Sequence, residues 1–279
     1  MPIHDQSYRR YTGRRDAGHT AWLVIATTGI GALLKKRALL ALLFIAWIPF
    51  FRWALQIYLS ATFPNMTMLA MEPESFRDFF DSASVFVFFV TVYIGAGLVA
   101  NDRRANALQI YLAKPLTRAE YVAGKMTILA LFLLLVTWLP AMLLLLLQIA
   151  FAGTLAFVRD NAFLLPAITV FSALIVSAAV FSMLALSSLS NSSRFVAVLY
   201  AGLVLFTRAL FEVSRGVTGS SSASWLSVSA SLEQVGDFVF GQRLRYDTPV
   251  AVSVLVVFLL VGLSAVVLSR RIRGVEVVT

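Results

Sequence analysis

The chain has 279 residues, of which 59% are hydrophobic and only 13% are charged. Because an ordinary soluble domain carries about 25% charged residues, this composition excludes a water-soluble globular protein. The formal net charge of +9 would suit a nucleic-acid-binding protein, but the basic residues are sorted by loop, which indicates membrane topology, so we expect no nucleic-acid partner.

The first 37 residues combine a basic tail with a short apolar stretch. Ala21–Leu34 is shorter than the roughly 20 residues that cross a bilayer, and its polar residues share one arc of a helical wheel. Lys35, Lys36 and Arg37 follow it, so we predict an interfacial elbow helix anchored at the cytoplasmic surface. A signal peptide is the alternative, but no small-residue cleavage site follows and the basic flank is on the wrong side.

Six later segments are apolar over 17 residues or more, which is near or above the length that crosses the hydrocarbon core. We therefore predict an all-α polytopic membrane protein with six transmembrane helices plus the N-terminal interfacial elbow helix. Pro140, inside the third segment, lacks a backbone donor and so allows a kink, although ordinary packing explains the proline equally well. The six segments are Ala38–Ser60, Phe79–Ala100, Ile128–Ile149, Phe163–Leu186, Phe195–Phe211 and Val250–Leu268.

The distribution of basic residues sets the orientation. With the N-terminus inside, 16 Lys and Arg residues lie in cytoplasmic parts and five lie in outer loops, so both termini are predicted to be cytoplasmic. We expect a multi-pass protein of the inner (plasma) membrane. It divides into residues 1–37 and a transmembrane domain of residues 38–279, with an inner loop at 101–127 and an outer loop at 212–249.

Two stretches of the outer side have distinct compositions. The segment from Ala61 to Asp78 is acidic, which is typical of a solvated loop rather than a cation site. Within the loop 212–249, Trp225–Phe240 has the spacing of one or two short amphipathic helices at the outer interface.

The inner loop is charged and helix-forming. Asp102 is suited to the start of a helix over Arg103–Ala113, because its carboxylate faces the positive end of the helix dipole. Pro115 ends that helix, since proline disfavours helical geometry at the preceding residue. One face of the predicted helix carries three apolar residues, Leu108, Tyr111 and Leu112.

A second helix is predicted immediately afterwards. Thr117 and Glu120 have the spacing of a capping box, in which each side chain bonds the backbone N–H of the other. From there the pattern continues through Tyr121 and Lys125 into the third span.

The order of these motifs resembles that of ABC-2-type transporter permeases. The resemblance is concentrated between Gly95 and Pro140 and departs from the family pattern twice: Asp102 stands where Glu is usual, and Asn106 stands where Gly is common. The residues that carry it are Gly95-x-Gly97, Asp102-Arg103-Arg104, Leu112-Ala113-Lys114-Pro115-Leu116-Thr117-Arg118 and Glu120-Tyr121-x-x-Gly124-Lys125.

This resemblance implies a coupling helix in the loop 101–127 that docks on a separate ABC ATPase subunit. It also implies pairing with a second permease copy, and both a homodimer and a heterodimer fit the sequence. The apolar face of the loop would form the dock and its charged residues the rim. The implied coupling residues are Asp102, Arg103, Arg104, Leu108, Tyr111, Leu112, Lys114, Pro115 and Arg118.

The chain carries no nucleotide-binding or catalytic motif of its own. Gly124-Lys125 lacks the earlier glycine of a phosphate-binding loop, and no Leu-Ser-Gly-Gly-Gln signature is present, so we expect ATP to be bound by a partner chain. We expect no cofactor and no metal: cysteine is absent, and His4 and His19 both lie in the polar tail.

Two arginines fall inside predicted spans and are possible pathway residues. Arg52 lies 15 residues into the first span and Arg208 lies 14 residues into the fifth. Each could line a substrate path, but long basic side chains near a span end also reach the headgroups, which the positions favour. The predicted function is the permease subunit of an ATP-driven transporter. The alternatives are a membrane scaffold that anchors a cytoplasmic partner and an intramembrane enzyme acting on lipids.

Overall fold

The computed structural model describes residues 21–63, 72–107, 117–152, 159 and 161–271. Every regular element within these ranges is a helix, and six helical stretches are long and apolar enough to cross a membrane. A shorter apolar helix, α1 (Ala21–Leu34), precedes them. The predicted all-α class with six spans and an additional N-terminal helix is confirmed.

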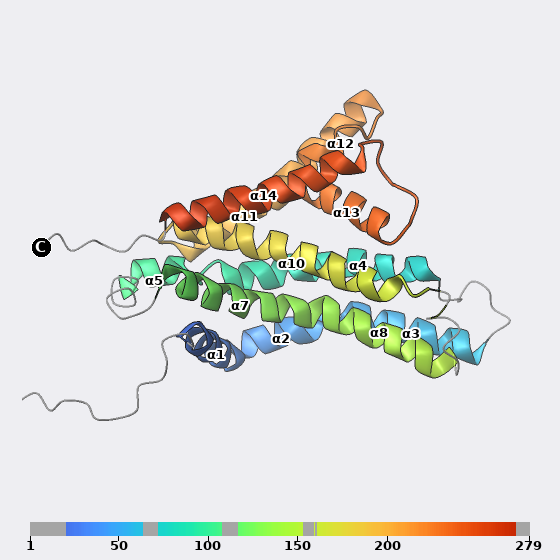
Figure 1. Ribbon diagram of the computed structural model, residues 1–279, viewed down its shortest axis with the longest axis horizontal. Helices are drawn as coiled ribbons and strands as arrows, with labels where there is room; N and C mark the ends of the chain where they lie inside the picture. Colours follow the sequence, from blue (N-terminus) through green and yellow to red (C-terminus); the bar gives the residue numbers. More distant parts are fainter. Residues whose placement is uncertain (1–20, 64–71, 108–116, 153–158, 160, 272–279) are drawn as a thin grey trace, which may run out of the picture.

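Helix α1 crosses the direction of the spans, since Figure 1 shows it nearly end-on while the spans run across the view. It packs against the start of α7 (Arg118–Val136). Gly124 permits this close approach, because a Cβ there would lie 2.9 Å from both the Trp22 carbonyl oxygen and Ile25. We call the end of the bundle that carries α1 and α5 (Ala100–Arg104) the inner end.

Three of the spans are interrupted. The first consists of α2 (Arg37–Ala46) and α3 (Ile48–Thr62), and Pro49 lies in the first turn of α3. The third consists of α7 and α8 (Trp138–Ala152), separated at Thr137, three residues before Pro140. The fifth consists of α11 (Ser193–Ala201), the π-helical turn η3 (Gly202–Phe206) and α12 (Thr207–Thr218).

The second, fourth and sixth spans supply the remaining long helices. They are α4 (Pro73–Gly95), which is followed by α5, then α10 (Leu164–Leu189) and α14 (Val250–Arg271). On the outer side, η4 (Ser224–Leu226) and α13 (Val228–Val239) match the amphipathic helices expected there.

Two expectations about the outer side are wrong. Helix α4 begins at Pro73 rather than Phe79, so Arg77 and Asp78 belong to a helix instead of a solvated loop. Proline suits the first turn of a helix, where its missing N–H costs nothing. The fifth span likewise continues to Thr218, and Gly219 ends it with a positive φ of 69°.

The core lies between the second, third and fourth spans. About half of each apolar window is buried in these spans (56%, 56% and 50%), against 17% in the fifth and sixth, so the last two spans lie at the periphery. Figure 1 shows α12 and α14 diverging from the central bundle at the outer end, with α13 beneath them. Helix α13 packs against α14, α10 and α4 and so connects the peripheral spans to the core.

Candidate functional site

At the inner end, α5 is bonded to α7 through Asp102. One carboxylate oxygen of Asp102 accepts a hydrogen bond from the Tyr121 hydroxyl at 2.8 Å and an ion pair from Lys125 Nζ at 2.7 Å. Both partners lie on α7. Because the Asp102 and Lys125 side chains are largely buried, at 19% and 12% exposure, solvent screens this pair less than a surface pair.

The same region is bonded to α10 through Ser187. Its buried hydroxyl donates to the Ala96 carbonyl oxygen at 3.0 Å and accepts from the backbone N–H groups of Val99 (3.2 Å) and Ala100 (3.0 Å). The N-terminus of α5 has no side-chain cap from its own N-cap residue, so the Ser187 hydroxyl on α10 accepts from backbone N–H groups that the helix leaves unpaired. Arg103 Nη1 also donates to the carbonyl oxygen of Ser188. We call Asp102, Arg103, Tyr121, Lys125 and Ser187 the inner cluster.

The start of α7 has the predicted capping box. The Glu120 N–H donates to the Thr117 hydroxyl oxygen at 3.2 Å, and the Thr117 N–H donates to the Glu120 carboxylate at 2.8 Å. These two bonds set the first turn of the third span at the point where it leaves the inner loop.

The first helix of the inner loop differs from the prediction. Helix α5 begins at Ala100 with Asp102 in its first turn, and it ends at Arg104 because Asn106 adopts a positive φ of 51°. The helix expected over Arg103–Ala113 is therefore wrong in its first part, which is broken at Asn106, and residues 108–113 lie outside the described residues. The left-handed conformation is one that asparagine tolerates, and this is the position where the resembled family commonly has glycine.

The implied coupling residues fall into three groups. Asp102 and Arg103 are bonded inside the inner cluster, whereas Arg104 and Arg118 are exposed at the inner end. The remaining five lie outside the described residues: Leu108, Tyr111, Leu112, Lys114 and Pro115.

At the outer end, Arg77 lies almost completely buried between α4 and α13, with a side chain that is 1% exposed. Its Nε donates to Asp237 at 3.1 Å, its Nη2 donates to the Glu233 carbonyl oxygen at 3.1 Å, and its Nη1 pairs with Asp81. All three nitrogen atoms of the guanidinium therefore have partners, as a buried charge requires.

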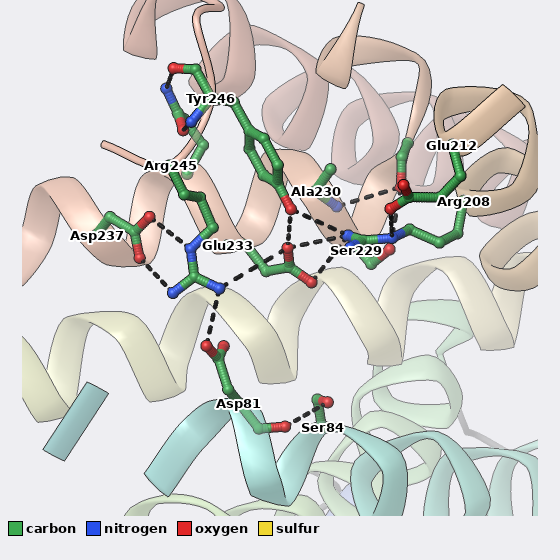
Figure 2. Close-up of polar contacts among 12 residues, drawn as sticks. Asp81, Ser84, Arg208, Glu212, Ser229, Ala230, Glu233, Asp237, Arg245 and Tyr246 are labelled. Atoms are coloured by element: carbon green, nitrogen blue, oxygen red, sulfur yellow. Dashed lines mark hydrogen bonds and ion pairs between the residues drawn. The ribbon is translucent and has the colours of Figure 1, made fainter. Parts of the chain in front are cut away.

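Arg245 neutralises the same two carboxylates from the loop after α13 (Figure 2). Two of its nitrogens contact Asp237, at 2.7 and 2.9 Å, and its Nη1 contacts Asp81 at 2.8 Å. Burial disfavours the charge of Arg245, but the hydrogen bonds to Asp237 and Asp81 outweigh it and raise the pKa of Arg245 above its ordinary value.

Glu233 is the centre of the adjoining contacts in Figure 2. Arg208 Nη1 lies 2.9 Å from the Glu233 carboxylate, Arg208 Nε lies 3.0 Å from Glu212, and the Tyr246 hydroxyl donates to Glu233. Burial and then the neighbouring Glu233 carboxylate raise the pKa of Tyr246 to about 12. The outer cluster is defined by Arg77, Asp81, Arg208, Glu212, Glu233, Asp237, Arg245 and Tyr246.

The two arginines inside spans have different surroundings. Arg208 is paired with α12 and α13 carboxylates and lines a cavity, so its charge is neutralised within the protein. Arg52 is exposed, and its guanidinium lies 4.0 Å from the centre of the Trp53 ring.

A cavity of about 430 Å³ lies between α4, α10, the fifth span and α13. Its walls are mainly apolar, and Arg77, Asp81, Arg208 and Glu233 line its outer part. The Ser182 hydroxyl, which also lines the cavity, donates to the Ala178 carbonyl oxygen of its own helix at 2.6 Å.

Of the outer cluster, the sequence analysis singled out Arg208 alone and missed the residues that pair with it. The available signal was spacing: Arg77 with Asp81, Arg208 with Glu212, and Glu233 with Asp237 are each four residues apart, which places both members on one helical face. That spacing does not predict which helical faces contact one another in the fold, because ion pairs of the cluster join residues as far apart as Asp81 and Arg245, 164 positions away.

A family model described as ABC-2 family transporter protein matches residues 24–224, from α1 to η4. The chain belongs to this family. It is a multi-pass ABC-2-type permease, that is, a membrane component of an ABC transporter and a transport subunit rather than a catalyst. No curated protein matches the chain. The matched range includes the whole inner cluster of the permease, whereas α13 and α14 lie beyond it.

Proposed function

We propose that this permease forms the translocation path of an ATP-driven transporter as a dimer, and that separate ATPase subunits act on it through the loop 101–127. The observation that carries this proposal is the attachment of α5. Asp102 bonds it to α7, and Ser187 bonds it to α10. Because α5 is bonded to α7 and α10, a force that displaces the loop also displaces these membrane-spanning helices.

The contact with the ATPase is assigned to the remaining residues of the loop. Leu108, Tyr111 and Leu112 provide the apolar dock, with the charged side chains around them at the rim. Arg104 and Arg118 are exposed on either side of that stretch, which supports this assignment. ATP is bound in the partner chain. The permease resides in the inner (plasma) membrane with both termini in the cytoplasm.

The test is purification of the tagged permease in mild detergent, identification of the chains that accompany it, and measurement of their ATPase activity. We expect an ABC ATPase to copurify with the unaltered protein and to be lost when the three dock residues Leu108, Tyr111 and Leu112 are changed together to alanine. The matched control changes three exposed apolar residues on α12, Leu210, Val213 and Val217, to alanine and should retain the ATPase.

Two outcomes would contradict the proposal. Retention of the ATPase by the triple dock variant would place the contact elsewhere. A complex that binds and hydrolyses ATP without any change in the membrane helices would indicate a scaffold that anchors its partner.

A further inference from the structure

The Ser187 side chain joins α10 to both sides of the turn between α4 and α5. Its hydroxyl bonds Ala96 on one side of the turn and Val99 and Ala100 on the other, and the side chain has no exposure to solvent. A hydroxyl has one donor and two acceptor sites, so this geometry uses its full capacity. The turn and the end of α10 are therefore held at a fixed separation.

Two further contacts support the same junction. Gly95 at the end of α4 packs directly on Met183 of α10, where an added Cβ would clash with the methionine side chain. Arg103 donates to the last turn of α10 at the Ser188 carbonyl oxygen. Helix α5 is thus attached to α10 by side-chain and backbone bonds, although the two are distant in sequence.

The opposite end of α10 is joined to the outer cluster by Phe171. The Arg77 guanidinium lies 5.1 Å from the centre of the Phe171 ring, on the α4 side. On the α13 side, a Cβ at Gly236 would lie 2.6 Å from the ring, so the glycine lets α13 approach closely. Phe171 and Ser187 are 16 residues apart on one continuous helix, a separation of about 24 Å.

We propose that α10 transmits the displacement of the coupling loop to α13 and the outer cluster, and that Ser187 is the positioning residue on which this transmission depends. This inference rests on the proposed function and adds to it a helix that does not flank the loop in the sequence. The uninterrupted α10 acts as a rigid element between the two attachment points. By contrast, the third span is divided at Thr137, and α4 ends at Gly95, before the turn that leads to α5.

The chain offers a matched pair of substitutions at adjacent buried serines. Ser187→Ala removes all three bonds to the α4–α5 turn. Ser188→Ala removes a hydroxyl that bonds only its own helix, at the Ala185 carbonyl oxygen (2.7 Å), and leaves the backbone acceptor of Arg103 in place. Both side chains are at most 1% exposed, so the two changes remove the same group from equivalent surroundings.

The experiment measures a nucleotide-dependent distance in the complex of the permease with its ATPase. The chain contains no cysteine, so spin labels can be placed at Leu55→Cys on α3 and Phe238→Cys on α13, both exposed positions, and their separation reports the movement of α13 relative to the first span. Distances are recorded by electron paramagnetic resonance without nucleotide and with Mg²⁺, ATP and vanadate. We expect the distance between the labels to differ between the two conditions in the doubly labelled protein and in its Ser188→Ala variant. In the Ser187→Ala variant, we expect this difference to be at most half as large.

A full distance change in Ser187→Ala would overturn the role of Ser187. Copurification of the ATPase is measured for every variant, so loss of the partner is separated from loss of transmission. If the doubly labelled protein itself shows no change with the ATPase bound, the proposed function fails and the role of α10 fails with it. If Ser187→Ala does not assemble, Arg103→Ala is used instead, because it removes the bond from the half-buried Arg103 to the Ser188 carbonyl oxygen. A full nucleotide-dependent distance change in Arg103→Ala would also refute the inference.

Discussion

Replacement of Arg77 by methionine tests whether the outer cluster holds α13 on the central bundle. Methionine keeps the length and apolar stem of the side chain but removes the charge. Asp237, with a side chain that is 1% exposed, then depends on Arg245 alone, and the Glu233 carbonyl oxygen loses its guanidinium donor.

The magnitude follows from this burial. Removing one partner of a buried ion pair costs about 3–5 kcal/mol, because the other charge is left uncompensated. Arg245 keeps two bonds to Asp237 and one to Asp81, so we expect the lower end of that range, about 3 kcal/mol. The control Arg215→Met alters an exposed arginine on α12 and should change stability by less than about 0.5 kcal/mol.

The measurement is the free energy of unfolding in mixed micelles, followed by tryptophan fluorescence as a denaturing detergent is added. A second variant combines Arg77→Met with Asp237→Leu, which removes both charges and should recover at least half of the loss, since apolar replacement of a buried pair is often neutral. If Arg77→Met matched the Arg215→Met control, or if the double variant were less stable than the single one, the reasoning from burial would be refuted.

Three further predictions concern single positions. Gly236→Ala should destabilise the protein by about 1–3 kcal/mol, because its Cβ would lie 2.6 Å from a ring and a guanidinium, whereas Gly262→Ala, with nothing within 4 Å, should be neutral or stabilising in the same unfolding assay. The pKa of Tyr246 is about 12 in the folded protein against an ordinary value of 10.0, so its contribution to stability is complete below pH 10.0 and is lost as the pH rises through about 12. The absorbance difference between the wild type and Tyr246→Phe should show the phenolate forming near pH 12. Thr117→Ala should cost about 1 kcal/mol and increase hydrogen exchange at the Glu120 amide, and unchanged exchange there would contradict the role of the capping box.

Features that depend on neighbouring residues could be predicted from the sequence. The capping box at Thr117 and Glu120 requires only a four-residue pattern, and Pro140 allows a kink because it lacks a backbone donor. Hydrophobicity alone predicts that the second span begins at Phe79, because it excludes the charged Arg77, although Pro73 is typical of a helix start. The end of α5 could not be read from hydrophobic periodicity, because it depends on the positive φ of Asn106, a conformation that asparagine shares with glycine.

The sequence by itself determined the six spans, the short helix before them and the resemblance to ABC-2 permeases, because hydrophobic length and local motifs are properties of consecutive residues. Only the tertiary structure decided where the charges and hydroxyls are paired. Ser187 looks like any serine in a polar turn until α10 is placed beside the α4–α5 turn, and Arg77 looks solvated until α13 covers it. The physical reason is that a buried hydrogen bond or ion pair depends on which helical faces meet, and residues that are 87 or 160 positions apart carry no local signal of that meeting.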